Sequence, residues 1–241
     1  MSYRENPKTE GSGIICAIPQ RGTCPNKCEG CFFQSGRSYL EPLDENLPNL
    51  PSLKIATGRV VRINDGNDSN VNRELVMRTA QRYPMRFYNT AIPEELDKFD
   101  APVVLTVNPG VMTDDDAFLL SPIPRNLMFV RFRTNAWNLE LADRVVAHYC
   151  GKETPVVLTF MAYYREQTPE KFNDKYIFRK RTLNSYWAIT TAAWEEIMRR
   201  YRYNKWVYSC GKIEGEKGTS ACRHCGNCLR EYFAAMEKLR A

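Results

Sequence analysis

Short apolar segments alternate with amphipathic ones along most of this chain, and that alternation constrains the fold more than any other feature. The apolar segments are rich in Val, Ile and Leu, as buried strands are, and the segments between them carry apolar residues at helical spacing. The predicted strands are 13–19, 59–65, 86–92, 102–108, 127–133, 155–164 and 205–210. The predicted helices are 71–83, 93–99, one that begins at Thr113, 138–149, one around 194–201, and 229–240.

Strands that alternate with helices form a parallel sheet with the helices packed against it. The chain has about six or seven strand–helix units, fewer than a closed (β/α)8 barrel requires, so the predicted α/β fold is an open, partial barrel. The polar and aromatic stretch 165–189 is assigned to no strand or helix. With 241 residues the chain suffices for one sizeable core. We therefore expect a barrel over 1–209 and a small cysteine-rich extension over 210–241.

Charge and hydropathy limit the location of the protein more than its function. The formal charge of +6 suits an anionic substrate or nucleic acid, but no module for nucleic-acid recognition is visible. No apolar run approaches the roughly 18 residues of a membrane-spanning helix. The N-terminal segment MSYRENPKTEGSG lacks the apolar stretch of a signal peptide. We expect a cytoplasmic protein with no membrane partner.

Three cysteines lie directly after the first predicted strand, where Cys24, Cys28 and Cys31 form the pattern C-x3-C-x2-C. In a reducing compartment, clustered cysteines indicate metal ligands or redox groups rather than disulfides. Three thiolates can hold a cubane iron–sulfur cluster through three irons and leave the fourth iron open, whereas structural zinc takes four ligands. Cys16 could complete a zinc site or a closed cluster. Its place in an apolar strand instead favours a small buried residue, and Cys150 is interpreted in the same way.

A second group of four cysteines lies near the C-terminus, with the spacing C-x11-C-x2-C-x2-C. Its members are Cys210, Cys222, Cys225 and Cys228. Four thiolates can close a [4Fe–4S] cluster or a tetrahedral zinc site, and His224 could replace one of them around zinc. The ligand types alone leave both metals open.

The first cysteine motif, together with the strand–helix order through about residue 210, resembles the radical S-adenosylmethionine (SAM) superfamily, although no subfamily is identified. In that family the motif follows the first strand of a partial (β/α)6, TIM-like barrel. The resemblance implies a [4Fe–4S] cluster whose open iron binds SAM, with reductive cleavage of SAM to methionine and a 5′-deoxyadenosyl radical that acts on a substrate. It also implies a reductant such as flavodoxin or ferredoxin, and it favours an auxiliary iron–sulfur cluster over zinc at the C-terminal cysteines.

The resemblance also suggests where SAM would lie, with two departures from the family pattern. The residue before the last cysteine of the motif is often aromatic in the family, whereas here it is Gly30, so Phe33 or Phe32 is expected beside the adenine. The family's Gly-rich turn after the second strand is replaced by the stretch NDGNDSN.

Within that stretch, Asp65, Gly66 and Asp68 are the candidates for contact with SAM. The alternative is a turn whose side chains cap the next helix, and this is the expected role of Ser69 and Asn70. Both interpretations use the ability of short polar side chains to accept hydrogen bonds near the end of a strand.

Polar residues at two further predicted strands complete the candidate site. Asn108 closes the fourth strand, and Arg131 and Arg133 lie in the fifth among apolar residues. Burying an arginine without a partner is costly, and residues two apart in a strand share a face, so both arginines are expected to point inward. The predicted partner is an anion, either the SAM carboxylate or a carboxylate or phosphate of the substrate. A structural salt bridge is the alternative.

Three functions remain open from the sequence. The leading one is a radical SAM enzyme that acts on an unknown substrate, which could be a small molecule, a peptide or nucleic acid. The second is a non-catalytic iron–sulfur or zinc-binding module, such as an electron carrier or a nucleic-acid binder. The third is a glycyl-radical-enzyme activase, although the extra cysteines of those activases usually follow the first motif closely. No side chain is assigned as a catalytic acid or base.

Overall fold

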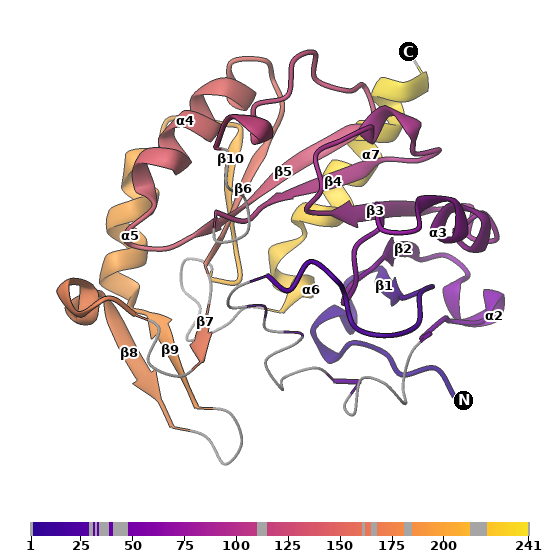
Figure 1. Ribbon diagram of the computed structural model, residues 1–241, viewed down its shortest axis with the longest axis horizontal. Coiled ribbons are helices and arrows are strands. Elements are labelled where there is room, and N and C mark those ends of the chain that lie inside the picture. The colour runs from indigo at the N-terminus through magenta and orange to yellow at the C-terminus, as the bar shows by residue number, and fades with distance from the viewer. Residues whose placement is uncertain are drawn as a thin grey trace.

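The computed structural model describes residues 2–28, 31, 33, 39–40, 48–109, 115–160, 162–164, 168–180, 185–212 and 221–240. Its main element is a curled, seven-stranded sheet that forms a half-barrel (Figure 1). The strands lie in the order β1 (Ile14–Ala17), β2 (Val60–Ile63), β3 (Arg86–Thr90), β4 (Val103–Val107), β5 (Leu127–Thr134), β6 (Val156–Phe160) and β10 (Val207–Cys210). All neighbouring pairs are parallel. Each strand falls within or overlaps a predicted one, which confirms the α/β class and the open parallel sheet.

The longer predicted helices are also present. They are α3 (Arg73–Ala80), α4 (Leu139–Cys150), α5 (Thr191–Arg200) and α7 (Asn227–Arg240). The predicted helix 93–99 is reduced to a single 3-10 turn, η3 (Leu96–Lys98). The predicted helix start at Thr113 lies outside the described residues, and η4 (Asp115–Phe118) follows it. Shorter helices are η1 (Pro7–Thr9), α2 (Leu53–Ala56), η5 (Glu170–Lys175) and α6 (Cys222–Cys225).

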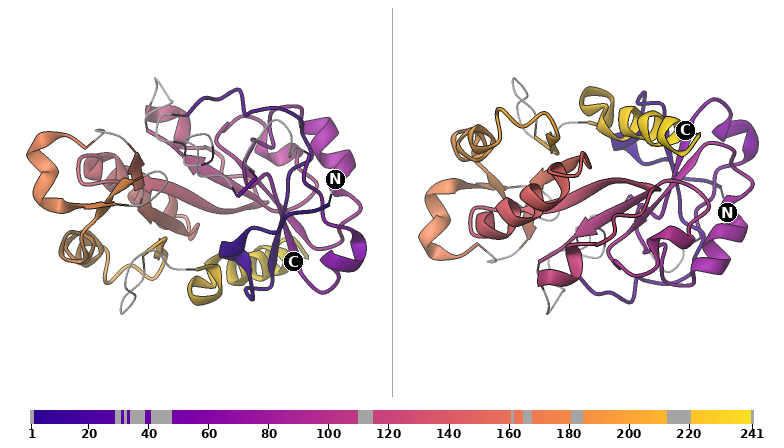
Figure 2. Two further views of the ribbon diagram at one scale, coloured as in Figure 1. Left: turned by 90° about the horizontal axis from the view of Figure 1, so that it is seen from below. Right: turned by 90° about the horizontal axis from the view of Figure 1, so that it is seen from above.

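The two faces of the sheet are covered by different helices. One face packs against α3, α4 and α5 in a core that includes Val76, Val145 and Ile197. The opposite face packs against α7, which buries Tyr232 and Ala235 in a second core (Figure 2, α7 in yellow). The sheet is thus apolar on both faces, as expected for a parallel sheet with helices on each side. The C-terminal helix belongs to this packing, and β10 spans the boundary predicted between 209 and 210.

The predicted strand 155–164 and the unassigned stretch after it differ from the expectation. The segment divides into β6 and β7 (Ala162–Tyr164), and β7 forms a separate antiparallel sheet with β8 (Tyr176–Arg179) and β9 (Tyr186–Ile189). Aromatic rings hold this small sheet against the main body: the ring of Trp137 lies 5.1 Å from that of Tyr163 and 5.5 Å from that of Tyr176. The aromatic residues of this stretch therefore extend the main core onto the small sheet.

Candidate metal centre

On the face of the sheet that packs against α7, here called the α7 face, each strand changes from apolar to polar toward its carboxyl end. Side chains two residues apart share a face, so an apolar residue near α7 is followed on the same face by a polar residue or a cysteine. The pairs are Ile14 and Cys16, Val60 and Arg62, Phe87 and Asn89, Val104 and Thr106, Phe129 and Arg131, Val157 and Thr159, and Tyr208 and Cys210. Ligands of parallel sheets bind at the carboxyl ends, where these polar groups lie.

The first cysteine group lies beside that polar layer. Cys24, Cys28 and Cys31 are half-buried, and the backbone N–H of Cys31 donates to the carbonyl of Cys28 at 3.1 Å. Burial raises the pKa of Cys24 to about 11, with smaller contributions from the thiols of Cys28 and Cys31. The three thiols therefore lie within electrostatic reach of one another. Metal binding would have to displace their protons, as it does at thiolate sites in general.

Asn108 and Arg133, two residues predicted to line the site, both face Cys28. Burial raises the pKa of Cys28, while a hydrogen bond from the side chain of Asn108 and the charge of Arg133 act to lower it. Asn108 is 5% exposed and follows β4 directly. The structure thus brings the carboxyl ends of β4 and β5 to the cysteine loop, although β4 and β5 lie three and four places from β1 in the sheet.

Asp68 connects the cysteine loop to the sheet. Its carboxylate accepts hydrogen bonds from Thr90 Oγ1 at 2.7 Å, the N–H of Ala91 at 2.7 Å, Asn26 Nδ2 at 3.0 Å and the N–H of Asn70 at 2.9 Å. Burial raises the pKa of Asp68, and these four donors oppose that shift. A carboxylate has about four acceptor positions. The arrangement favours a structural role for Asp68 over contact with SAM.

Gly66 and Phe33 lie against each other. A Cβ built on Gly66 would overlap the ring carbons of Phe33, so the turn after β2 has room only for glycine. The ring is 4% exposed and packs with Ile18 and Leu40 in a third small core. Phe33 therefore anchors the cysteine loop on the sheet. Phe32 and Gly30 lie outside the described residues.

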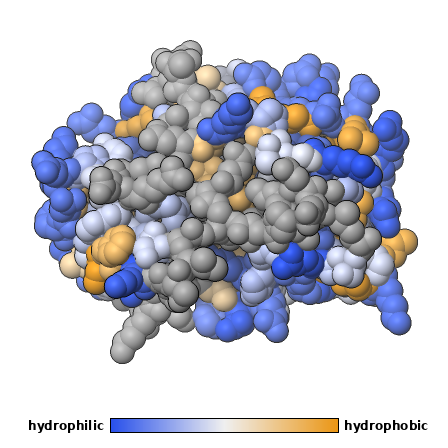
Figure 3. All heavy atoms as spheres, turned by 60° about the horizontal axis from the view of Figure 1, so that its bottom comes forward, coloured by the Kyte–Doolittle hydropathy of each residue, from blue (hydrophilic) through white to orange (hydrophobic). Residues whose placement is uncertain are grey.

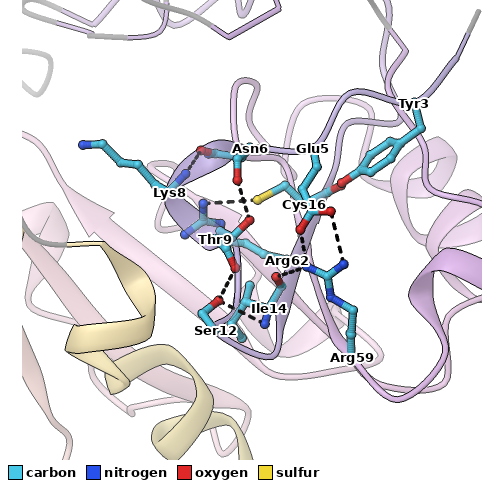
Figure 4. Close-up of polar contacts among 10 residues, drawn as sticks. All are labelled: Tyr3, Glu5, Asn6, Lys8, Thr9, Ser12, Ile14, Cys16, Arg59 and Arg62. Carbon is cyan, nitrogen blue, oxygen red and sulfur yellow. Dashed lines mark hydrogen bonds and ion pairs between the residues drawn. The ribbon is translucent and has the colours of Figure 1, made fainter.

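Asp65 is held by a residue that the sequence reasoning missed, Arg62. The two form an ion pair, and Arg62 Nη2 also donates to Cys16 Sγ at 3.2 Å (Figure 4). Asn6 donates to the other oxygen of Asp65. Cys16 is fully buried, as predicted, and burial raises its pKa above the ordinary range. Arg62 could have been identified in the same way as Arg131, as a charge inside an apolar strand.

The expected caps of the helix after β2 are different residues. Helix α3 begins at Arg73 and its N-cap is Asn72, so the capping role predicted for Ser69 and Asn70 is wrong. Ser69 accepts a hydrogen bond from Asn64 Nδ2 at 3.1 Å, and Asn70 Nδ2 donates to the carbonyl of Glu94 at 2.7 Å. Both side chains form hydrogen bonds within the turn that precedes the helix. The helix begins at Arg73, whereas the apolar pattern predicted a start at residue 71.

Arg131 lies on the α7 face of the sheet, two residues after Phe129 of the α7 core. The guanidinium carbon lies 5.6 Å from the centre of the Phe129 ring, and Nη1 donates to Asn89 Oδ1 at 3.2 Å. Both partners are neutral, and Arg131 takes part in none of the ion pairs found among the described residues. The alternative of a structural salt bridge is thus not observed for Arg131.

The four C-terminal cysteines also converge on the α7 face. Cys210, at the end of β10, and Cys228, in α7, pack against the core beneath that face. A hydrogen bond with Cys225 is the largest cause that raises the pKa of Cys210 above the ordinary range. Burial raises the pKa of Cys222, and the thiols of Cys228 and Cys210 add to that shift. Residues distant in sequence are therefore neighbours here.

The arrangement of the thiols bears on which metal group they could hold. Within the described ranges, no group of three metal-binding side chains is close enough to share a single ion. A cubane cluster distributes its cysteine ligands over several irons, so its ligands lie further apart than those of one ion. The donor set, seven thiols of which three follow β1 and four gather at β10, α6 and α7, fits iron–sulfur groups in chemical type.

Buried polar atoms without a partner identify further residues of this region. In the part of the chain that the structure describes, the buried atoms Arg62 Nε, Thr159 Oγ1 and Asn64 Oδ1 have no hydrogen-bond partner. Lys212, directly beyond β10, is 6% exposed and its Nζ donates to Thr191 Oγ1 at 3.1 Å. Buried polar atoms without a partner, unlike Lys212 Nζ, are uncommon in cores unless a ligand or water meets them. The sequence does not distinguish Thr159 and Lys212 as site residues, because threonine is common in strands and lysine is common in loops.

Comparison with protein-family models, curated proteins and solved structures found no match for this chain. In the part of the chain that the structure describes, the helices are too short or too polar to span a membrane. Hydrophilic residues dominate the described surface in Figure 3, with hydrophobic residues in separate spots. The geometry of the cysteines and of the α7 face is therefore the basis for a functional proposal.

Proposed function

We propose that the protein is a radical SAM enzyme whose half-barrel corresponds to a partial (β/α)6, TIM-like barrel. In this proposal Cys24, Cys28 and Cys31 hold a [4Fe–4S] cluster. The observation that carries it is the position of these three thiols: they lie within electrostatic reach of one another, directly after the first strand of a curled parallel sheet. Three ligands leave one iron without a protein ligand.

The bound cluster would supply one electron, taken from a reductant such as flavodoxin or ferredoxin, that breaks a C–S bond of SAM and yields methionine and a 5′-deoxyadenosyl radical. The chain's own residues prepare the site. Asn108 donates to Cys28, and Phe33 fixes the loop against Gly66 and excludes water from its inner side. Arg131, which has only neutral partners among the described residues, is suited to a carboxylate or phosphate of SAM or of the substrate.

The C-terminal cysteines belong to the same proposal as a second metal site. Cys210 shares the α7 face with Arg131, whose charge acts to lower the pKa of the Cys210 thiol. A second [4Fe–4S] cluster at this position would lie along the same sheet as the first. Zinc at these cysteines is the other possibility, and metal analysis distinguishes the two because only the cluster contains inorganic sulfide.

The test is reductive cleavage of SAM by protein purified and reconstituted without oxygen. With dithionite as reductant, the protein should release 5′-deoxyadenosine, and Cys24→Ser, Cys28→Ser and Cys31→Ser should each abolish that release. Cys150→Ser is the matched control, since Cys150 lies in α4 away from both cysteine groups. Iron and sulfide without any 5′-deoxyadenosine would instead support a non-catalytic iron–sulfur module, and the proposal would be wrong.

A further inference from the structure

Arg62 is a nearly buried cation on the α7 face. Its side chain is 11% exposed and that of its partner Asp65 is 9% exposed. One nitrogen, Nη2, serves both Asp65 and the thiol of Cys16, toward which the guanidinium points in Figure 4. Nε is buried and has no hydrogen-bond partner among the described residues. The N–H group on Nε of Arg62 is therefore a buried donor that is available to a further acceptor.

Among the described residues, Arg62 and Arg131 of the α7 face have one carboxylate partner in total, Asp65. Asp65 is shared between Arg62 and the side-chain amide of Asn6, and the neighbouring cation Arg131 has a neutral acceptor, Asn89. Of these two guanidinium groups, the described residues therefore supply a carboxylate partner to Arg62 only. Buried charges are retained in proteins when they are paired, so a further anion is expected here.

The C-terminal cysteines are placed to supply that anion. Burial acts to lower the pKa of Arg62, but Asp65, Cys16, Cys222 and Cys228 together raise it well above its ordinary value. The same guanidinium also acts to lower the pKa of Cys210. Arg62 is therefore within electrostatic reach of three cysteines of the second group.

The N-terminal segment also connects Arg62 with the helix that carries two of the C-terminal cysteines. Asn6, which donates to Asp65, is also the N-cap of η1, where its side chain accepts from the N–H of Lys8 at 2.9 Å. Helix α6, which carries Cys222 and Cys225, packs against η1. Asp65 and Asn6 thus connect Arg62 to η1, the segment against which the cysteine-bearing helix α6 packs.

We propose that Arg62 is a positioning residue for a negatively charged iron–sulfur centre held by the four C-terminal cysteines, and that its Nε donates a hydrogen bond to a sulfur of that centre. The inference rests on the part of the proposed function that places a second cluster there. Four thiolates around a [4Fe–4S] core leave a net negative charge, which the guanidinium compensates. Donors to the sulfurs of a cluster raise its reduction potential.

The test isolates the C-terminal site in the full-length chain. Cys24, Cys28 and Cys31 are replaced by Ser together, and this parent is reconstituted anaerobically with iron and sulfide. Arg62→Gln is then compared with Arg62→Lys, which keeps the charge, and with Arg59→Gln, which removes a nearby arginine that is paired with Glu5. The readouts are iron and sulfide per chain, resistance of the iron to a chelator, and the midpoint potential of the cluster.

The parent should bind iron and sulfide. Arg62→Gln should make the iron about tenfold easier to remove and shift the midpoint potential to more negative values. Arg62→Lys should recover most of the loss, and Arg59→Gln should behave as the parent. Far-UV circular dichroism verifies that each variant is folded. If Arg62→Gln does not fold, Arg62→Lys still tests the proposal. Lysine keeps the charge but lacks the Nε donor, so the midpoint potential should be slightly more negative than that of the parent.

Two results would overturn the inference. One is a parent that takes up zinc, or no metal, and no sulfide. The other is a folded Arg62 variant with the same iron retention and potential as the parent. Neither measurement involves SAM, so a wild-type protein that fails to release 5′-deoxyadenosine would count against the proposed function and leave this result unchanged.

Discussion

The ring of Phe33 occupies the space in which a side chain on Gly66 would lie. One residue belongs to the cysteine loop and the other to the turn after β2, so their contact fixes the loop on the sheet. The cysteine loop can hold a cluster in one place only if such contacts determine its path, which makes this pair a direct test of the arrangement.

Gly66→Ala should lower the free energy of unfolding by about 1–3 kcal/mol, because the new methyl group must displace a buried ring. It should also reduce the iron bound after reconstitution. In a Phe33→Ala background the same change should cost much less, since the ring carbons that it meets are gone. Urea denaturation of the four proteins of this cycle measures the coupling. Equal costs in both backgrounds would show that the two residues are not in contact.

Asp68→Asn should destabilise the protein by about 1–3 kcal/mol, because an NH2 group would then face donors that now meet an oxygen. The loss should appear in urea denaturation and in a lower iron content, as Asn26 of the cysteine loop loses its acceptor. Asp97→Asn, at an exposed position of η3, is the control and should have little effect. A stable Asp68→Asn protein that has lost SAM binding would instead indicate a direct contact with SAM.

Tyr232→Ala should cost about 3–5 kcal/mol of stability, as other large aromatic truncations in cores do. The neighbouring Phe233 is 50% exposed, whereas Tyr232 is 3% exposed, so Phe233→Ala should change stability by only about 0.5 kcal/mol. Thermal or urea unfolding compares the pair. Similar small effects for both would mean that α7 is a detachable extension rather than a cover of the sheet.

Glu95 provides a prediction of pH dependence. Its hydrogen bond with Arg73 lowers the pKa of the carboxyl group from its ordinary value of 4.5. A lowered pKa in the folded state adds stability above the unfolded pKa, and this is lost as the pH falls through the folded value. Wild type should therefore be slightly more stable than Glu95→Gln at pH 7, and the difference should vanish in acid.

The effect of Glu95 should be small, because the pair is exposed to solvent and screened by salt. Glu94→Gln, one residue earlier and also exposed, is the matched control. Urea denaturation at neutral and acid pH, at low ionic strength, measures both variants. A difference between wild type and Glu95→Gln that grows toward acid would contradict the assigned direction of the pKa shift.

Much of the fold could be predicted because its signals are local. A strand such as β4 is mostly buried on both faces of the sheet, so its sequence is a nearly continuous apolar run. The inward direction of Arg131 follows from the two-residue period of a strand and the apolar residues on either side. The antiparallel sheet of β7, β8 and β9 was missed, since its residues are mostly exposed or half-buried and form no such run.

The assignment of the cysteines as ligands stays a prediction, and the residues that support them were largely not predicted. The assignment rests on spacing, because clustered thiols are typical of metal or redox sites. The four donors to Asp68 come from three separate places in the chain, and Asn26, Thr90 and Ala91 all lie more than 20 positions away. No local pattern can reveal partners that meet only when β3 is placed beside β2.

The sequence by itself determined the alternation of strands and helices and the two groups of thiols, since both depend on residue type and on spacing along the chain. Only the tertiary structure decided that α7 covers one face of the sheet and that Arg62 lies among Cys16, Asp65 and the C-terminal cysteines. The reason is physical: packing and charge compensation depend on distances in space, and the folding of the sheet brings together residues about 160 positions apart.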